Sequence, residues 1–340
     1  MAETISAAPA PDATAAGRRP ATRRPSTLRA VASGVLGMCL VGGSVGVSRE
    51  LTSAPLFTAQ AIRYAAASLI LLALAKAARV PIVRPRGREW LWLTGIAALG
   101  LVLFNVAVVR GVAHAEPAVI AVAVACVPVV LGVIGPLLEG RRPNRRVLLA
   151  AVVVTAGSAL VEGTGRADAI GIGWAAVALV CEASFTLMAV PVLGRHGAWG
   201  VSLHSVWIGA VMLALLGLAG EGPNAAGRLS GAEWAAMAYL AIMVTAVAFL
   251  LWYSTVAALG VGAVGLLTGV APICAAFTGI ATGGRVPGPL VWAGVLVVIS
   301  GLAVGLVRRT RPADPVRPAE SDDSAERSAA SAELAANASV

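Results

Sequence analysis

Residues 117–140 read PAVIAVAVACVPVVLGVIGPLLEG, and no charged side chain occurs before Glu139. A helix needs about 20 apolar residues to cross a bilayer core of about 30 Å. The run is continuous rather than alternating between polar and apolar residues, which favours a helix over a strand of a membrane barrel. The stretch therefore predicts a transmembrane helix.

The composition extends this prediction to most of the chain. Of its 340 residues, 58% are hydrophobic and only 13% are charged, whereas soluble domains carry about 25% charged residues. An ordinary soluble enzyme, a disordered chain and a fibrous protein are therefore excluded. We predict an all-α integral membrane protein with ten transmembrane helices, at residues 31–48, 56–75, 90–109, 117–137, 147–162, 171–190, 201–219, 234–253, 262–282 and 290–307.

The two ends differ from this apolar body. Residues 1–29 and 308–340 contain few aliphatic side chains, so neither segment can bury enough apolar surface to offset its chain entropy. We expect both to be disordered tails. The first apolar run has no convincing cleavage site after it, which favours a retained span over a signal peptide.

The distribution of basic residues predicts an orientation. With the N-terminus in the cytoplasm, 20 of the 26 basic residues lie in the tails and the inside loops, and one, Arg63, lies within a span. This bias follows the positive-inside rule and places both termini in the cytoplasm of a cell-membrane protein. The formal net charge of +9 is thereby explained by the orientation of the chain in the lipid bilayer, its expected partner. We expect no nucleic-acid partner.

The apolar body repeats itself at an offset of 144 residues. The shift lays Gly87-Arg88-Glu89-Trp90 over Gly231-Ala232-Glu233-Trp234, Pro128 over Pro272, and Gly157 over Gly301. Each repeat, at 30–163 and 170–307, is predicted to hold five spans, and an odd number of crossings inverts the second copy. Inverted repeats are an architecture that many secondary transporters use to alternate access to a midplane site.

In each half, a mid-span proline is followed by a loop and a glycine-rich span. The segments are Pro128…Leu138-Glu139-Gly140 with Val147 to Gly157, and Pro272…Gly283-Gly284 with Val291 to Gly301. With Pro55…Arg63 at the second span, this pattern resembles the EamA family of the drug/metabolite transporter superfamily. The resemblance implies a carrier of amino acids, other metabolites or drugs, mostly outward. The Gly-Glu pair frequent in the family at the ends of the fourth and ninth spans is replaced here by Leu138-Glu139 and by Gly283.

Two charged residues lie at depth in predicted spans. Glu182 is about 16 Å into the sixth span. Intramembrane acids are functional by default, so it is a candidate to bind a substrate ammonium or carry a coupling proton, against a purely structural role in joining helices. Arg63 lies about 12 Å into the second span. It could pair with Glu182 until a zwitterionic solute separates them, or extend its side chain to the interface.

Three further residues are candidates for solute contact. Gln60 lies almost one turn from Arg63, and Asn105 lies in the outer half of the third span. Their amides could bind solute or join helices, and for Asn105 we favour helix joining. Trp207 is deeper than an interfacial tryptophan, so it could stack on a solute or pack in the core.

Pro128 and Pro272 remove a backbone donor mid-span, and we predict that they act as hinges rather than passive bends. Glu139 lies among arginines at a span end, and we interpret it as a charge neutralised at the headgroup surface.

Cofactor chemistry is not expected. The four cysteines, Cys39, Cys126, Cys181 and Cys274, are dispersed and there are three histidines, so we predict no metal site and no cofactor. The chain has no G-x-x-x-x-G-K-[ST] motif, which excludes ATP hydrolysis of the P-loop type.

We therefore predict a secondary transporter, not an enzyme, that exports a small metabolite, amino acid or drug-like solute, driven by a proton gradient or by solute exchange. The alternatives are a polytopic membrane enzyme, a pore or structural membrane protein, and an uptake permease of the same fold. Assembly as a homodimer stays open.

Overall fold

The computed structural model describes residues 27–281 and 286–306, and every regular element in these ranges is a helix. Residues 1–26 and 307–340, which make up most of the two predicted tails, lie outside the described residues. The first helix begins at Thr27, so the last three residues of the predicted N-terminal tail are helical.

The helices follow the predicted spans closely. The first half contains α1 (Thr27–Gly43), α2 (Val45–Ser48), η1 (Arg49–Leu51), α3 (Leu56–Ala77), α4 (Glu89–Gly95), η2 (Ile96–Leu103), α5 (Phe104–Val112), α6 (Pro117–Val124), α7 (Val127–Leu138) and α8 (Arg145–Glu162). The second half contains α9 (Ala169–Leu187), α10 (Val190–Gly220), η3 (Ala225–Arg228), α11 (Gly231–Tyr239), η4 (Leu240–Ala248), α12 (Phe249–Leu259), α13 (Val261–Gly265), η5 (Leu266–Gly269), α14 (Val270–Ala281) and α15 (Pro289–Leu306). The seventh predicted span starts later than α10, which extends back to Val190 across a non-helical residue at Gly197.

Within the described ranges, nine helical segments are long and apolar enough to cross a membrane. The fifth predicted span corresponds to α8, which has 18 residues and carries Arg145, Arg146 and Glu162 at its two ends. The all-helical membrane class is therefore confirmed, whereas the count of ten depends on α8.

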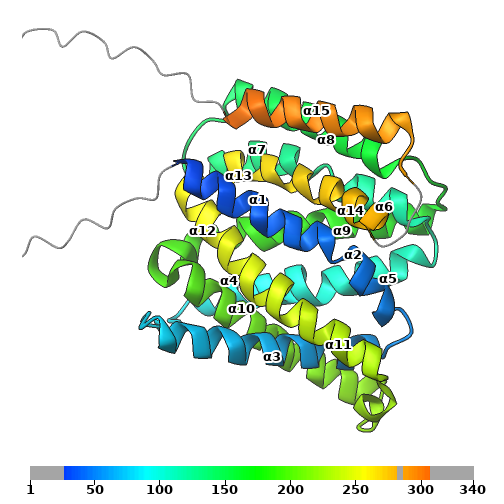
Figure 1. Ribbon diagram of the computed structural model, residues 1–340. Helices are drawn as coiled ribbons and strands as arrows, with labels where there is room; N and C mark the ends of the chain where they lie inside the picture. Colours follow the sequence, from blue (N-terminus) through cyan, green and yellow to red (C-terminus); the bar gives the residue numbers. More distant parts are fainter. Residues whose placement is uncertain (1–26, 282–285, 307–340) are drawn as a thin grey trace, which may run out of the picture. The chain divides into compact units, whose positions relative to one another are not determined.

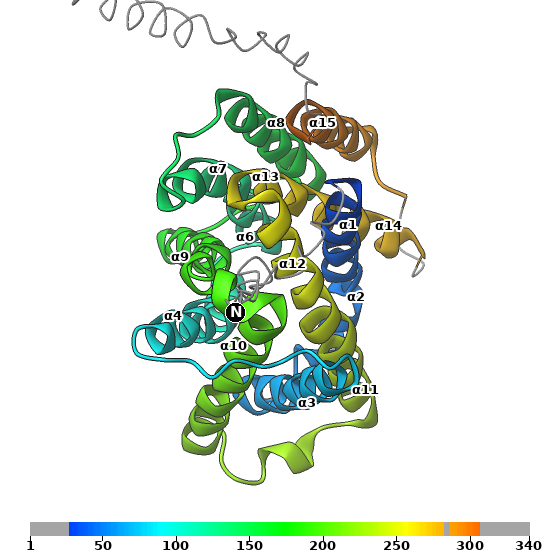
Figure 2. The same ribbon diagram turned by 90° about the vertical axis from the view of Figure 1, so that its left-hand side faces the viewer.

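The two halves repeat the same elements. The π-helices η2 and η4 begin 144 residues apart, and so do α6 and α13, and α8 and α15. Repeat-related helices also contact each other: α8 packs on α15, and α3 packs on α10. Figure 1 and Figure 2 show the α8–α15 pair at one edge of the bundle and α3 at the opposite edge.

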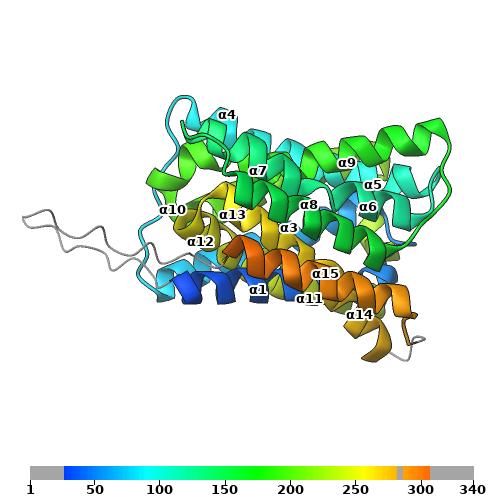
Figure 3. The same ribbon diagram turned by 90° about the horizontal axis from the view of Figure 1, so that it is seen from above.

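Helices α1 and α9 hold equivalent places in the two halves. α1 packs on α12 and α14, and α9 packs on the corresponding α5 and α7. Figure 3 shows α1 and α9 on opposite faces of the bundle. The space between these faces is where residues of both halves meet.

Helix breaks occur beside both mid-span prolines. α6 ends at Val124, and α7 begins at Val127 with Pro128 as its second residue. In the second half, the 3-10 turn η5 precedes α14, in which Pro272 is the third residue. A proline has no N–H for the preceding turn, so the regular helix is interrupted just before each one. The position of the breaks thus follows from the sequence, and their use as hinges stays a prediction.

Candidate functional site

A cavity of about 510 Å³ lies between the two halves, within the range of typical small-molecule sites. Most of its lining is apolar, with a few polar groups. The polar and aromatic residues that line it are Ser44, Ser48, Arg63, Tyr64, Phe104, Asn105, Ser158, Glu162, Glu182, Phe185, Phe249, Trp252 and Thr268.

Arg63 enters the cavity from α3 and is held by residues of both halves. Its Nε donates to Oγ1 of Thr245 at 3.0 Å, and its Nη1 donates to Oε1 of Gln60 at 3.3 Å. Thr245 belongs to the π-helix η4 and is fully buried. A guanidinium carries five N–H donors, and within the described ranges no other acceptor bonds to Arg63. Its remaining donors are therefore available to an anionic group in the cavity.

Asn105 reaches the same region through Tyr64, the neighbour of Arg63. The amide Nδ2 of Asn105 donates to the Tyr64 hydroxyl at 3.1 Å and to the Leu101 carbonyl at 2.6 Å. The centre of the Tyr64 ring lies 5.2 Å from Cζ of Arg63. Asn105 therefore joins α5 to α3 and also lines the cavity, and its contact with a solute stays a prediction.

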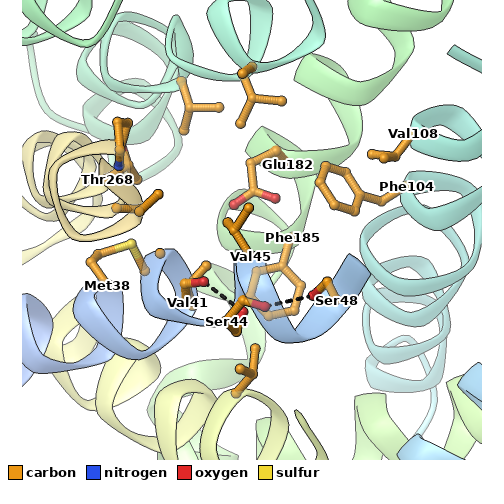
Figure 4. A pocket seen from close by; sticks show the side chains of 18 of the residues that line it. Met38, Val41, Ser44, Val45, Ser48, Phe104, Val108, Glu182, Phe185 and Thr268 are labelled. Atoms are coloured by element: carbon orange, nitrogen blue, oxygen red, sulfur yellow. Dashed lines mark hydrogen bonds between the residues drawn. The ribbon is translucent and has the colours of Figure 1, made fainter. Parts of the chain in front are cut away.

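Glu182 projects from α9 into the cavity. Figure 4 shows its carboxylate between the side chains of Val45, Phe104 and Phe185. Across the part of the chain that the structure describes, this carboxylate has no hydrogen-bond or ion-pair partner. A carboxylate without a hydrogen-bond partner among apolar side chains is suited to bind a solute that has both a cationic group and an apolar part.

Arg63 and Glu182 line one cavity without forming an ion pair with each other in the described structure. The hypothesis of a resting pair between them is therefore not what the structure shows. The physical reason is their placement, since α3 packs on α10 whereas α9 packs on α5, α6 and η2. Neither charge neutralises the other within the described residues.

Several polar cavity residues escaped sequence reasoning, among them Ser158, Glu162 and Tyr64. Ser158 has a buried hydroxyl with no hydrogen-bond partner among the described residues. Glu162 adds a second carboxylate at the end of α8, and Tyr64 supplies a phenol. The spacing of Ser158 and Glu162, four residues apart and therefore on one helix face, was a usable signal. A single threonine in an apolar helix, such as Thr245, gives no sign in the sequence that its hydroxyl contacts a site residue.

The other predicted residues are distributed unevenly. Pro272 lines the cavity. Gln60 is not among the lining residues, and its side chain accepts a hydrogen bond from Arg63, which is. Trp207 instead donates from Nε1 to Nδ1 of His204 at 3.1 Å and stacks edge-on with Trp90. Trp207 and Pro128 are not among the residues that line this cavity. The described residues contain no cluster of three potential metal ligands.

A helical membrane bundle built from two matching halves around a shared polar–apolar cavity defines the class of polytopic membrane transporters. The model of the EamA-like transporter family matches residues 28–162 and again residues 169–307. The chain belongs to the EamA-like transporter family, and it is a transporter rather than an enzyme.

Relatives agree with this family assignment. The chain is 24% identical over 286 residues to the uncharacterized transporter YetK of Bacillus subtilis, covering 81% of this chain and 86% of YetK. It is 25% identical over 229 residues to a protein of Streptantibioticus cattleyicolor named a probable terminal-alkyne amino-acid exporter, covering 67% and 76% of the two chains. A solved crystal structure shares the fold with a TM-score of 0.69 at 20% identity, covering 81% of this chain and 96% of the other.

Proposed function

We propose that this protein is a secondary transporter that exports zwitterionic, amphiphilic solutes, with amino acids carrying apolar side chains as the substrate class. The observation that supports this most directly is the separation of Arg63 and Glu182 within one cavity. The guanidinium would take the solute carboxylate and Glu182 the ammonium, while the apolar lining would take the side chain. One relative is named an amino-acid exporter, which agrees with this substrate class.

The mechanism we propose is alternating access between two inverted halves. In this arrangement α8 is the fifth span and brings the total to ten, because it has the same length as its counterpart α15 and packs along it. Its charged residues lie at its ends, where they reach the interfaces. Ten spans place both termini on one side, and the basic loops make that side the cytoplasm of a cell membrane.

The driving force in this proposal is a proton gradient or exchange of one solute for another. Glu182 is the group through which protons would be coupled, since it is a carboxylate in the cavity without a protein partner in the described ranges. Drug-like organic cations are the second candidate class, favoured by the additional carboxylate of Glu162.

Counterflow in proteoliposomes tests the function. Vesicles preloaded with unlabelled leucine should accelerate uptake of labelled leucine, whereas preloaded tetraethylammonium should not. The reverse preference would assign the cavity to organic cations. Saturation without acceleration by any preloaded solute would contradict a carrier. Leucine movement is then measured with a proton gradient imposed in each direction, which tests whether the gradient drives export or uptake.

Topology is tested separately with reporter fusions. Fusions at both termini should report the cytoplasm, and a fusion at the loop containing Arg166 should report the outside. A C-terminus outside the cell would contradict the ten-span arrangement.

A further inference from the structure

The broken helices of the two halves make different contacts at the two ends of the bundle. At one end of the bundle, α7 of the first half packs directly on α13 of the second half. A Cβ at Gly135 in α7 would lie only 2.6 Å from Cγ1 of Val261, so only glycine permits this approach. Figure 1 shows α7 and α13 together at this end of the bundle.

A carboxylate joins the same two helices. Oε1 of Glu139, just after α7, accepts a hydrogen bond from the backbone N–H of Val261 at 3.1 Å. Val261 begins its helical segment, so this N–H has no acceptor within its own helix. The side chain of Glu139 is only 18% exposed and also pairs with Arg141. Glu139 is therefore a half-buried bridge between the halves rather than only a headgroup-surface charge.

Gly260 completes this contact. It precedes Val261 with φ of +79°, a conformation that favours glycine, and a Cβ there would lie 3.1 Å from Nη2 of Arg141 and 3.4 Å from Oε1 of Glu139. The backbone of the second half thus lies directly against the ion pair of the first.

The repeat-related contact at the other end is open. The counterparts of α13 and α7 are α6 and α14, and the cavity lies between them, lined by Pro117 and Ala121 of α6 and by Ala271 and Ala275 of α14. The cavity extends to Ser48 and Glu162, near the ends of α2 and α8. Pro117 is the counterpart of Val261 and has no N–H, so a carboxylate cannot make the equivalent bond there.

We infer that Glu139 is a latch that keeps the α7–α13 end closed while the cavity is open at the α6–α14 end. This inference rests on the proposed alternating access. Passage to the opposite state requires the Glu139 carboxylate to leave the Val261 N–H and the α7–α13 contact to separate. By the orientation of the basic loops, the closed end is the cytoplasmic one, so the structure is outward-open.

Thiol labelling at the two ends tests the latch. In a background without the four native cysteines, Val264→Cys places a reporter at a fully buried position of α13, and Ala121→Cys places one in the open cavity. With Glu139 present, a small water-soluble maleimide should modify position 121 quickly and position 264 slowly. Glu139→Ala should raise the rate at 264 about tenfold and lower the rate at 121, because a hydrogen bond to a charged group is lost.

Opposite changes at the two reporters are the signature of a shifted equilibrium. Unchanged rates, or a rise at both positions from general loosening, would overturn the inference. Arg142→Ala is the matched control, because Arg142 lies beside Arg141 and is exposed. It should leave both rates as they are. If Glu139→Ala does not yield monodisperse protein, Glu139→Gln, which keeps an oxygen acceptor, should shift both rates in the same directions by less.

The same preparations separate the two proposals. Counterflow without any response of the reporters to Glu139 refutes the latch and leaves the proposed function standing. Opposite reporter changes in a protein that shows no counterflow refute the function as proposed and leave the two-state latch standing.

Discussion

Nε of Arg63 donates a hydrogen bond of 3.0 Å to Oγ1 of Thr245, and this bond joins α3 of the first half to the π-helix η4 of the second. π-helical turns occur frequently at functional sites. Thr245 lies in η4, so the cation of the proposed solute site is positioned from the opposite half of the protein.

Thr245→Val should weaken solute binding while the protein still folds, because valine keeps the shape of threonine but removes the acceptor for Arg63. We expect the half-saturation concentration for leucine counterflow to rise about tenfold. Thr245→Ser should restore it. Thr255→Val is the control, since this buried hydroxyl donates to the carbonyls of Ala30 and Leu251, away from Arg63. Equal effects of the two valine variants would contradict the positioning role.

Glu182→Gln should abolish leucine transport or its pH dependence without reducing the amount of protein in the membrane. The variant removes the charge proposed to meet the solute ammonium, a loss worth about 10- to 100-fold in affinity. An analogue of leucine without the amino group should bind the variant no more weakly than it binds the unaltered protein. Glu50→Gln, at an exposed site, is the control. Full transport with an unchanged pH response would remove Glu182 from the site.

Trp207→Phe should leave transport unchanged and lower thermal stability. The indole bonds to His204 and packs on Trp90 outside the cavity lining, so its loss removes a structural hydrogen bond worth about 1 kcal/mol. Melting of the detergent-solubilised protein, monitored by size-exclusion chromatography after heating, measures the stability. A raised half-saturation concentration with unchanged melting would place Trp207 at the solute after all.

Pro272→Ala should slow transport more than it weakens binding. Alanine restores the N–H that proline lacks, so the helix can continue through η5 and lose its break. We expect a several-fold lower counterflow rate at saturating leucine. Pro289→Ala is the control, because Pro289 is the first residue of α15, where a missing N–H costs little. Equal rates for the two variants would exclude a hinge at Pro272.

Asp168 should give the protein a dependence of stability on acid pH. Its pKa is lowered by the hydrogen bond from the Gly171 N–H and, second, by His114, whose Nδ1 lies 3.0 Å from Oδ2 of Asp168. A lowered pKa in the folded state means that stabilisation is present above the unfolded pKa of about 3.9 and is lost as the pH falls through the folded pKa. Asp168→Asn keeps a capping oxygen but not the charge.

Melting temperatures between pH 6 and pH 3 measure this effect. The decrease with falling pH should be smaller in Asp168→Asn than in the unaltered protein. Parallel curves for the two proteins would show that Asp168 does not contribute to the acid dependence.

The sequence by itself determined the membrane class, the helix positions to within a few residues in most spans, and the repeat. In lipid, each backbone polar group must be satisfied within its own helix, so the position of a membrane helix is a local property of the chain. The breaks beside Pro128 and Pro272 are local for the same reason. The depth of Arg63 and Glu182 could likewise be counted along the chain, and both line the cavity.

Only the tertiary structure decided which residues meet. Depth along a helix does not say on which face of the helix a side chain lies, so Trp207 and Glu182 were both candidates. Of these two residues, Glu182 lines the cavity and Trp207 does not. The hydroxyl of Thr245 gained its role from a bond to a residue 182 positions away in the chain. Glu139 lies at a span end in the sequence, and its contact with Val261 exists because α7 and α13 pack together. Such contacts depend on how the two halves pack, which no local pattern encodes.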